Sequence, residues 1–152
     1  MSMAREIYQQ IIVDHGRKPR NFAVMPPPCC VRHGQNPLCG DNLTLYVRSN
    51  DDIITDISFS GDGCAISMAS ASLLTELTKN MSYASIRILF DEFHAALVNG
   101  ASFEPSTLAH ERLSVLLGVA EYPARVKCAT LAWQTLMAVV NAVPDAEKIS
   151  TE

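Results

Sequence analysis

The chain opens with apolar residues at helical spacing. They lie at i, i+3, i+4, i+7 and i+8: Ala4, Ile7, Tyr8, Ile11 and Ile12. This spacing predicts an amphipathic helix, which we expect to end near His15-Gly16. The segment 17–30 contains Pro19 and then three consecutive prolines, so we expect a loop there.

Apolar and polar residues then alternate in two short segments. The alternation runs over 43–48 and again over 55–60, and it predicts two half-buried strands. The residues between them, Ser49-Asn50-Asp51-Asp52, have the composition of a turn. We therefore expect the two strands to pair as an antiparallel hairpin.

Helical spacing returns after Gly61-Asp62-Gly63 and continues towards the end of the chain. We expect helices at about 64–79, from a Ser82 cap to Asn99-Gly100, at about 108–117, and from Pro123 to about Val143, where Pro144 ends the last one. Because strands come first and helices follow, the order predicts an α+β domain with helices on one face of a small antiparallel sheet.

Length and composition set the number of domains. The chain has 152 residues, and we expect residues 1–152 to form a single domain. Hydrophobic residues make up 48% and charged residues 18%, which is enough apolar material for a core without a metal or a disulfide. Any metal site is therefore expected to serve a function rather than to hold the fold together.

Charge and the length of the apolar stretches argue against nucleic-acid and membrane partners. The net charge is −4, and no stripe of Lys and Arg interleaved with aromatic residues is present, so we expect no nucleic-acid partner. The apolar stretches fall short of the roughly 20 residues that span a bilayer. The first ten residues carry early charges and no apolar run typical of a secretory signal. We expect a cytoplasmic protein with no membrane contact.

Five cysteines introduce the first candidate chemistry. An odd number in a chain expected to be cytoplasmic favours metal binding or thiol chemistry over a disulfide framework. Cys29-Cys30 follows three prolines and is expected to be a reduced spare pair, with a redox centre as the alternative. The other three cysteines lie where the chain changes direction: Cys39, Cys64 and Cys128.

The surroundings of these three cysteines favour thiolates. Cys64 is expected at a helix N-terminus, where free N–H groups and the helix dipole stabilise negative charge. Cys128 lies early in the last helix, near Arg125 and Lys127. Cys39 is two residues before Asp41, so that a turn would aim both side chains at one point. Three thiolates and one carboxylate suit zinc or an iron–sulfur cluster; the plainer alternative is three small buried apolar side chains.

Each of these cysteines lies in a motif of several residues. The motifs are Asn36-Pro37-Leu38-Cys39-Gly40-Asp41, Gly61-Asp62-Gly63-Cys64-Ala65-Ile66-Ser67 and Ala124-Arg125-Val126-Lys127-Cys128-Ala129-Thr130-Leu131. With Asp14-His15 and Pro19-Arg20-Asn21, they resemble the motifs of the IscU/NifU N-terminal family of iron–sulfur cluster assembly proteins. The resemblance covers roughly residues 7–133.

The resemblance implies a fold, a ligand set and a partner. The family fold is a small three-stranded antiparallel sheet packed by about five helices, which places the third strand near Val31–Gln35. The implied metal ligands are Cys39, Asp41, Cys64 and Cys128. The implied activity is sulfur traffic for iron–sulfur cluster assembly, with a pyridoxal-phosphate cysteine desulfurase as partner.

Two features favour the SufU-type branch of the family. IscU-type members carry a histidine immediately before the third cysteine, where this chain has Lys127, and the stretch 99–122 resembles an extra segment of SufU-type members. That branch implies a zinc-bound sulfur acceptor that receives persulfide sulfur from a SufS-type desulfurase and supplies a downstream cluster scaffold or apo-proteins. The alternative is a scaffold on which an iron–sulfur cluster, or iron, is bound and passed on.

Within this interpretation we expect Cys39 to accept the sulfur, because it lies on a loop whereas Cys64 and Cys128 are held by helices. Arg125 and Lys127 are expected to stabilise thiolates or to dock the partner, with two ordinary solvated charges as the alternative. His33 is expected to be a polar histidine rather than a further ligand. A structural zinc module without sulfur uptake, or a cysteine- or zinc-dependent hydrolytic enzyme, are competing functions; the zinc deaminase motif of the latter class is absent.

Overall fold

The computed structural model describes residues 3–104, 107–142 and 149–150. Its elements follow one another as α1 (Met3–Arg17), β1 (Cys30–Asn36), β2 (Asp41–Asn50), β3 (Ile53–Asp62), α2 (Ala65–Thr78), α3 (Tyr83–Asn99), α4 (Leu108–Leu113), the 3-10 helix η1 (Ser114–Glu121), α5 (Pro123–Val140) and β4 (Ile149–Ser150). The predicted α+β class is confirmed in the described residues: three strands pair antiparallel, five α-helices pack on them, and the two-residue β4 adds a fourth strand to the sheet.

The sheet has the strand order β3-β2-β1-β4. Both predicted hairpin strands and the strand expected near Val31–Gln35 are present, and β1–β2 and β2–β3 pair antiparallel. Asp51 and Asp52 connect β2 to β3 with φ of 53° and 59°, as a tight hairpin turn requires. The two-residue strand β4 pairs parallel with β1, and a segment so short has no alternation from which to predict it.

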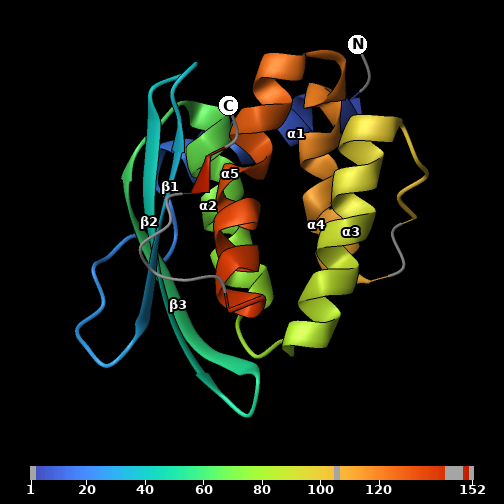
Figure 1. Ribbon diagram of the computed structural model, residues 1–152. Coiled ribbons are helices and arrows are strands. Elements are labelled where there is room, and N and C mark those ends of the chain that lie inside the picture. Colours follow the sequence, from blue (N-terminus) through green and yellow to red (C-terminus); the bar gives the residue numbers. More distant parts are fainter. Residues whose placement is uncertain (1–2, 105–106, 143–148, 151–152) are drawn as a thin grey trace.

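Helices cover one face of the sheet, as the order of elements predicted. Figure 1 shows α2 and α5 lying along the sheet, with α3 packed on the far side of α5. Trp133 of α5 is fully buried between these layers and contacts Phe93 of α3 with ring centroids 5.6 Å apart. No helix in the described ranges is both long and apolar enough to cross a membrane.

Two helical boundaries differ from the expectation. The helix predicted at 108–117 is divided into α4 and η1, in which Gly118 and the β-branched Val115 and Val119 reduce the preference for an α-helix. The last helix ends at Val140. The expected end at Val143-Pro144 lies outside the described residues.

Candidate metal centre

Three segments of the fold converge at one edge of the sheet. The register pairs Asn36 with Asp41 across the β1–β2 turn and Asn42 with Asp62 across β2–β3. The loop that carries Cys39 and the end of β3 therefore lie at the same edge, and α5 approaches it with its first turns. This convergence explains how cysteines far apart in sequence meet.

Cys39, Asp41 and Cys128 form a compact group of potential metal ligands. One ligand atom from each lies within 4.8 Å of the other two. The Cys128 thiol donates a hydrogen bond to Cys39 Sγ at 3.1 Å. Asp41 and Cys128 are fully buried, whereas Cys39 is half-buried. Two sulfur donors and one carboxylate are a donor set that suits zinc or iron, so these residues fit the predicted metal.

Cys64 lies beside this group rather than within it. Its backbone N–H donates to Asp41 Oδ1 at 2.9 Å, and its Sγ caps α2 by accepting from the Ser67 N–H at 3.4 Å. The predicted position at a helix N-terminus is therefore confirmed. Of the four predicted ligands, the structure brings three together within 4.8 Å, and the role of Cys64 as the fourth stays a prediction.

The electrostatics of the group differ between its members. Burial is the main cause that raises the pKa of the Cys128 thiol, and hydrogen bonds with Cys39, Asp41 and Cys64 add to it. The negative charge of Cys64, followed by that of Cys128 and Cys39, raises the pKa of Arg125. The exposed Arg125 guanidinium thus lies near the cysteines, and its role stays a prediction. Lys127 precedes Cys128 on α5 and is half-buried; its role stays a prediction.

Two glycines let the chain bend closely around the carboxylate. Gly40 has φ of +72°, a left-handed conformation that places Cys39 and Asp41 on either side of a tight turn. At Gly63 an added Cβ would lie 2.9 Å from Asp41 Oδ1 and 3.1 Å from Ser67 Oγ. A side chain at Gly63 would displace the Asp41 carboxylate, whereas at Gly40 it would strain the left-handed backbone of the turn.

Two buried polar side chains near the ligands were not predicted from the sequence. Asn36 donates through Nδ2 to Asp41 Oδ2 at 3.3 Å and to Cys128 Sγ at 3.5 Å. The Ser67 hydroxyl is fully buried and has no hydrogen-bond partner among the described residues. Both residues lie within the cysteine motifs, so their place in those motifs was the available signal.

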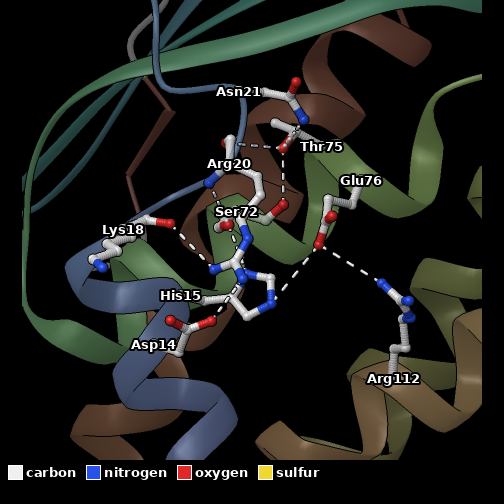
Figure 2. Close-up of polar contacts among 9 residues, drawn as sticks. All are labelled: Asp14, His15, Lys18, Arg20, Asn21, Ser72, Thr75, Glu76 and Arg112. Carbon is white, nitrogen blue, oxygen red and sulfur yellow. Dashed lines mark hydrogen bonds and ion pairs between the residues drawn. The ribbon is translucent and has the colours of Figure 1, made fainter.

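A second polar cluster lies between α1, α2 and α4. Figure 2 shows His15 between Ser72 and Glu76, with Arg112 reaching Glu76 from α4. His15 Nδ1 is 2.7 Å from Ser72 Oγ, and His15 Nε2 is 3.7 Å from Glu76 Oε1. Burial is the main cause that lowers the pKa of His15. The order serine, histidine, carboxylate resembles that of a hydrolase triad.

The geometry of Ser72 does not support hydrolysis. The residue is fully buried, and its Oγ accepts a hydrogen bond from the Arg20 backbone N–H at 2.8 Å. The adjacent cavity of about 410 Å³ is lined by His15 and Glu76 but not by Ser72. A substrate therefore has no approach to this hydroxyl. The cluster instead joins the loop after α1 to α2, since Asn21 Nδ2 also donates to Thr75 Oγ1 at 3.1 Å.

The Cys29-Cys30 pair is separate from the metal centre. All five cysteines are free thiols in the structure, and the reduced state expected for this pair stays a prediction. Cys30 begins β1, whereas the metal centre lies beyond its other end at Asn36; at ~3.3 Å per residue the two are ~20 Å apart. Cys30 Sγ accepts a hydrogen bond from Arg32 Nη1 at 3.1 Å. His33, the other residue considered near the centre, is exposed and lies 2.9 Å from Thr44 Oγ1.

Comparison with known proteins decides the family. The model of the NifU-like N terminal domain matches residues 7–145. A curated relative, the zinc-dependent sulfurtransferase SufU of Bacillus subtilis (strain 168), is 36% identical over 130 residues, which are 86% of this chain and 86% of that protein. The chain belongs to the NifU-like N terminal domain family. The resemblance predicted from the cysteine motifs is confirmed.

Other NifU-like proteins extend the comparison. The iron–sulfur cluster assembly scaffold protein IscU of Streptococcus pyogenes serotype M1 is 32% identical over 152 residues, covering 100% of this chain and 94% of that protein. A crystal structure of the N-terminal part of a nitrogen-fixing NifU-like protein from Brucella abortus superimposes with a TM-score of 0.80 at 20% identity, covering 94% of this chain and 100% of that one. The likeness to the Brucella abortus structure supports the fold alone.

Proposed function

We propose that this NifU-like protein is a metal-dependent sulfur acceptor in iron–sulfur cluster assembly, that zinc is its metal, and that a cysteine desulfurase is its sulfur donor. The observation that carries the proposal is the grouping of two thiols and one carboxylate within 4.8 Å of one another at the edge of the sheet. A relative named as a zinc-dependent sulfurtransferase supports the choice of zinc.

The proposed ligands are Cys39, Asp41, Cys64 and Cys128. Zinc bound there would hold the cysteines as thiolates and limit their reactivity. Arg125 faces the same cysteines and offsets part of their negative charge. A carboxylate among thiolates is a harder and more weakly matched donor, which favours exchange of a ligand over permanent closure of the site.

The proposed transfer is a thiol exchange in which nothing is oxidised overall. The Cys39 thiolate attacks the outer sulfur of the desulfurase persulfide, and a new S–S bond forms to Cys39 Sγ. The bond between the outer sulfur and the desulfurase cysteine breaks, and that cysteine leaves as a thiolate. The outer sulfur keeps its proton, so Cys39 ends as a persulfide.

The surroundings of the three cysteines favour Cys39 as the acceptor. It lies in the four-residue loop between β1 and β2 and is half-buried. Cys128 is fully buried, and burial raises the pKa of its thiol, which leaves less of the nucleophilic thiolate. Cys64 is held by its hydrogen bond to the first turn of α2.

The test is persulfide formation on cysteine variants. Wild-type protein is incubated with a cysteine desulfurase and cysteine, and its persulfide is measured by mass spectrometry. Cys39→Ser should abolish the added sulfur, whereas Cys29→Ser, at the opposite end of β1, should leave it unchanged. Full persulfide formation on Cys39→Ser would refute the assignment of the acceptor.

Cluster scaffolding is the second candidate function. The relative from Streptococcus pyogenes is named as a scaffold and aligns with the whole of this chain. Lys127, in place of the histidine of IscU-type members, argues against this candidate. Anaerobic reconstitution with iron and sulfide distinguishes the two: a stable cluster that transfers to an apo-protein supports the scaffold, and failure to hold a cluster supports the sulfur acceptor.

A further inference from the structure

Asn36 is the last residue of β1 and is fully buried directly beneath the candidate metal centre. Its backbone carbonyl accepts the Cys39 N–H at 3.2 Å, which closes the turn that carries Cys39. Its side chain contacts two further candidate ligands, Asp41 and Cys128. One residue therefore contacts all three members of the compact ligand group.

The Nδ2 group of Asn36 lies within hydrogen-bond distance of two ligand atoms. An amide nitrogen has two hydrogens, and Nδ2 lies 3.3 Å from Asp41 Oδ2 and 3.5 Å from Cys128 Sγ. The opposite orientation would direct the amide oxygen at a carboxylate and a thiolate, which repels once those groups are ionised. The side chain is thus oriented to donate to ligands in their metal-binding form.

The rest of the Asn36 amide adds nothing to the stability of the fold. Its Oδ1 is buried and has no hydrogen-bond partner among the described residues. A buried acceptor without a partner is unfavourable, so it offsets part of what the Nδ2 hydrogen bonds contribute to stability. A polar residue at this position is explained by what its nitrogen does.

We propose that Asn36 is a positioning residue that tunes the metal centre: it fixes the Asp41 carboxylate and reduces the electron donation of the Cys128 thiolate. This inference rests on the proposed metal-binding function. The carboxylate is held from both sides, because Oδ1 accepts from the Cys64 N–H and Oδ2 accepts from Asn36. Hydrogen bonds to ligands from neighbouring side chains orient them and change their basicity.

The experiment compares Asn36→Leu with wild type. The substitution keeps the number and branching of the side-chain heavy atoms and removes the amide donor. Asn42→Leu is the matched control, since Asn42 lies on the facing strand with an exposed side chain. Each protein is stripped of metal and titrated with Co²⁺, and the absorption of the thiolate-to-cobalt charge transfer is recorded. Chelator competition gives the Zn²⁺ affinity, and thermal unfolding of the stripped protein gives its stability.

Asn36→Leu should bind Zn²⁺ about 10–100-fold more weakly and shift the charge-transfer band to longer wavelength, because a thiolate without its hydrogen bond is easier to oxidise. The stripped variant should unfold at most a few degrees below wild type, because Asp41 Oδ2 loses one buried donor. The Asn42→Leu control should match wild type throughout. Asn36→Ser, too short to bridge both ligands, should show the same red shift as Asn36→Leu.

Three outcomes would overturn the inference. The first is an unchanged charge-transfer band and an unchanged Zn²⁺ affinity in Asn36→Leu. The other two, a large loss of stability in the stripped variant and failure of both Asn36 variants to fold, would indicate a structural role. A further result distinguishes failure of this inference from failure of the proposed metal-binding function. If wild type itself shows no thiolate-to-cobalt absorption, the proposed metal centre is wrong whatever Asn36 does.

Discussion

Gly34 in the middle of β1 determines how closely the strand packs against α5. An added Cβ would overlap Thr135 Oγ1 and would lie 3.1 Å from Leu131 Cδ1. Thr135 is fully buried, and its hydroxyl donates to the Leu131 carbonyl at 2.8 Å. Because Thr135 is fully buried and its hydroxyl is bonded within α5, we expect Gly34→Ala to push β1 and α5 apart.

The expected loss can be worked out from this overlap. Overpacking of a core by one methyl group destabilises by about 1–3 kcal/mol, and the overlap with a short, hydrogen-bonded side chain favours the upper half of that range. For a chain of this length, each kcal/mol lowers Tm by about 2–4 °C. Gly34→Ala should therefore lower Tm by about 4–12 °C.

A double-mutant cycle isolates the contact. Thr135→Ala removes the overlapping atom, so Gly34→Ala introduced into that background should recover about 1–2 kcal/mol of its loss. The assay is urea unfolding followed by circular dichroism. Gly118→Ala is the matched control, because an added Cβ there meets nothing within 4 Å. Unchanged stability of Gly34→Ala, or strict additivity with Thr135→Ala, would refute this description of the β1–α5 contact.

Three further predictions concern other parts of the molecule. The pKa of His15 is lowered, chiefly by burial, so the unfolded chain takes up the proton first as the pH falls. The free energy of unfolding should therefore decrease below about pH 6.5. His15→Gln should flatten that decrease in unfolding experiments between pH 7 and pH 5, and an equal slope in both proteins would contradict the prediction. Ser82 caps α3 through the Ser85 N–H, and Ser82→Ala should destabilise by about 1 kcal/mol in urea unfolding, whereas a change below a few tenths would show that the cap is replaced. Iodoacetamide should modify Cys128 more slowly than Cys39 in chelator-treated protein, because Cys128 is buried and its pKa is raised; equal rates by peptide mass spectrometry would argue against that burial.

The sequence was most informative where one pattern dominated. Alternation over 43–48 and 55–60 predicted two strands, and Ser82 and Gly100 marked the ends of α3, because each signal is local and physical. The division of the helix predicted at 108–117 into α4 and the 3-10 helix η1 was not predicted, nor was the two-residue strand β4. Helical spacing does not distinguish an α-helix from a 3-10 helix, and a two-residue strand is too short to show alternation.

The candidate metal centre was likewise predicted in part from the sequence, and the rest of it depends on the tertiary fold. The motifs identified the cysteines and Asp41, but the grouping of Cys39, Asp41 and Cys128 within 4.8 Å depends on strand register and on the approach of α5. The contacts of Asn36 also arise only from the tertiary fold. Spacing along a chain does not show which polar side chain becomes buried beneath a ligand.

The most direct test of the central claim is the metal and sulfide content of the protein purified without oxygen. Zinc, iron and acid-labile sulfide are measured on the same sample, with Asp41→Ala as the comparison. The proposed function predicts about one zinc per chain without sulfide in wild type, and clearly less zinc in Asp41→Ala. Iron with a matching amount of sulfide and little zinc would contradict the zinc-bound sulfur acceptor and identify the protein as a cluster scaffold.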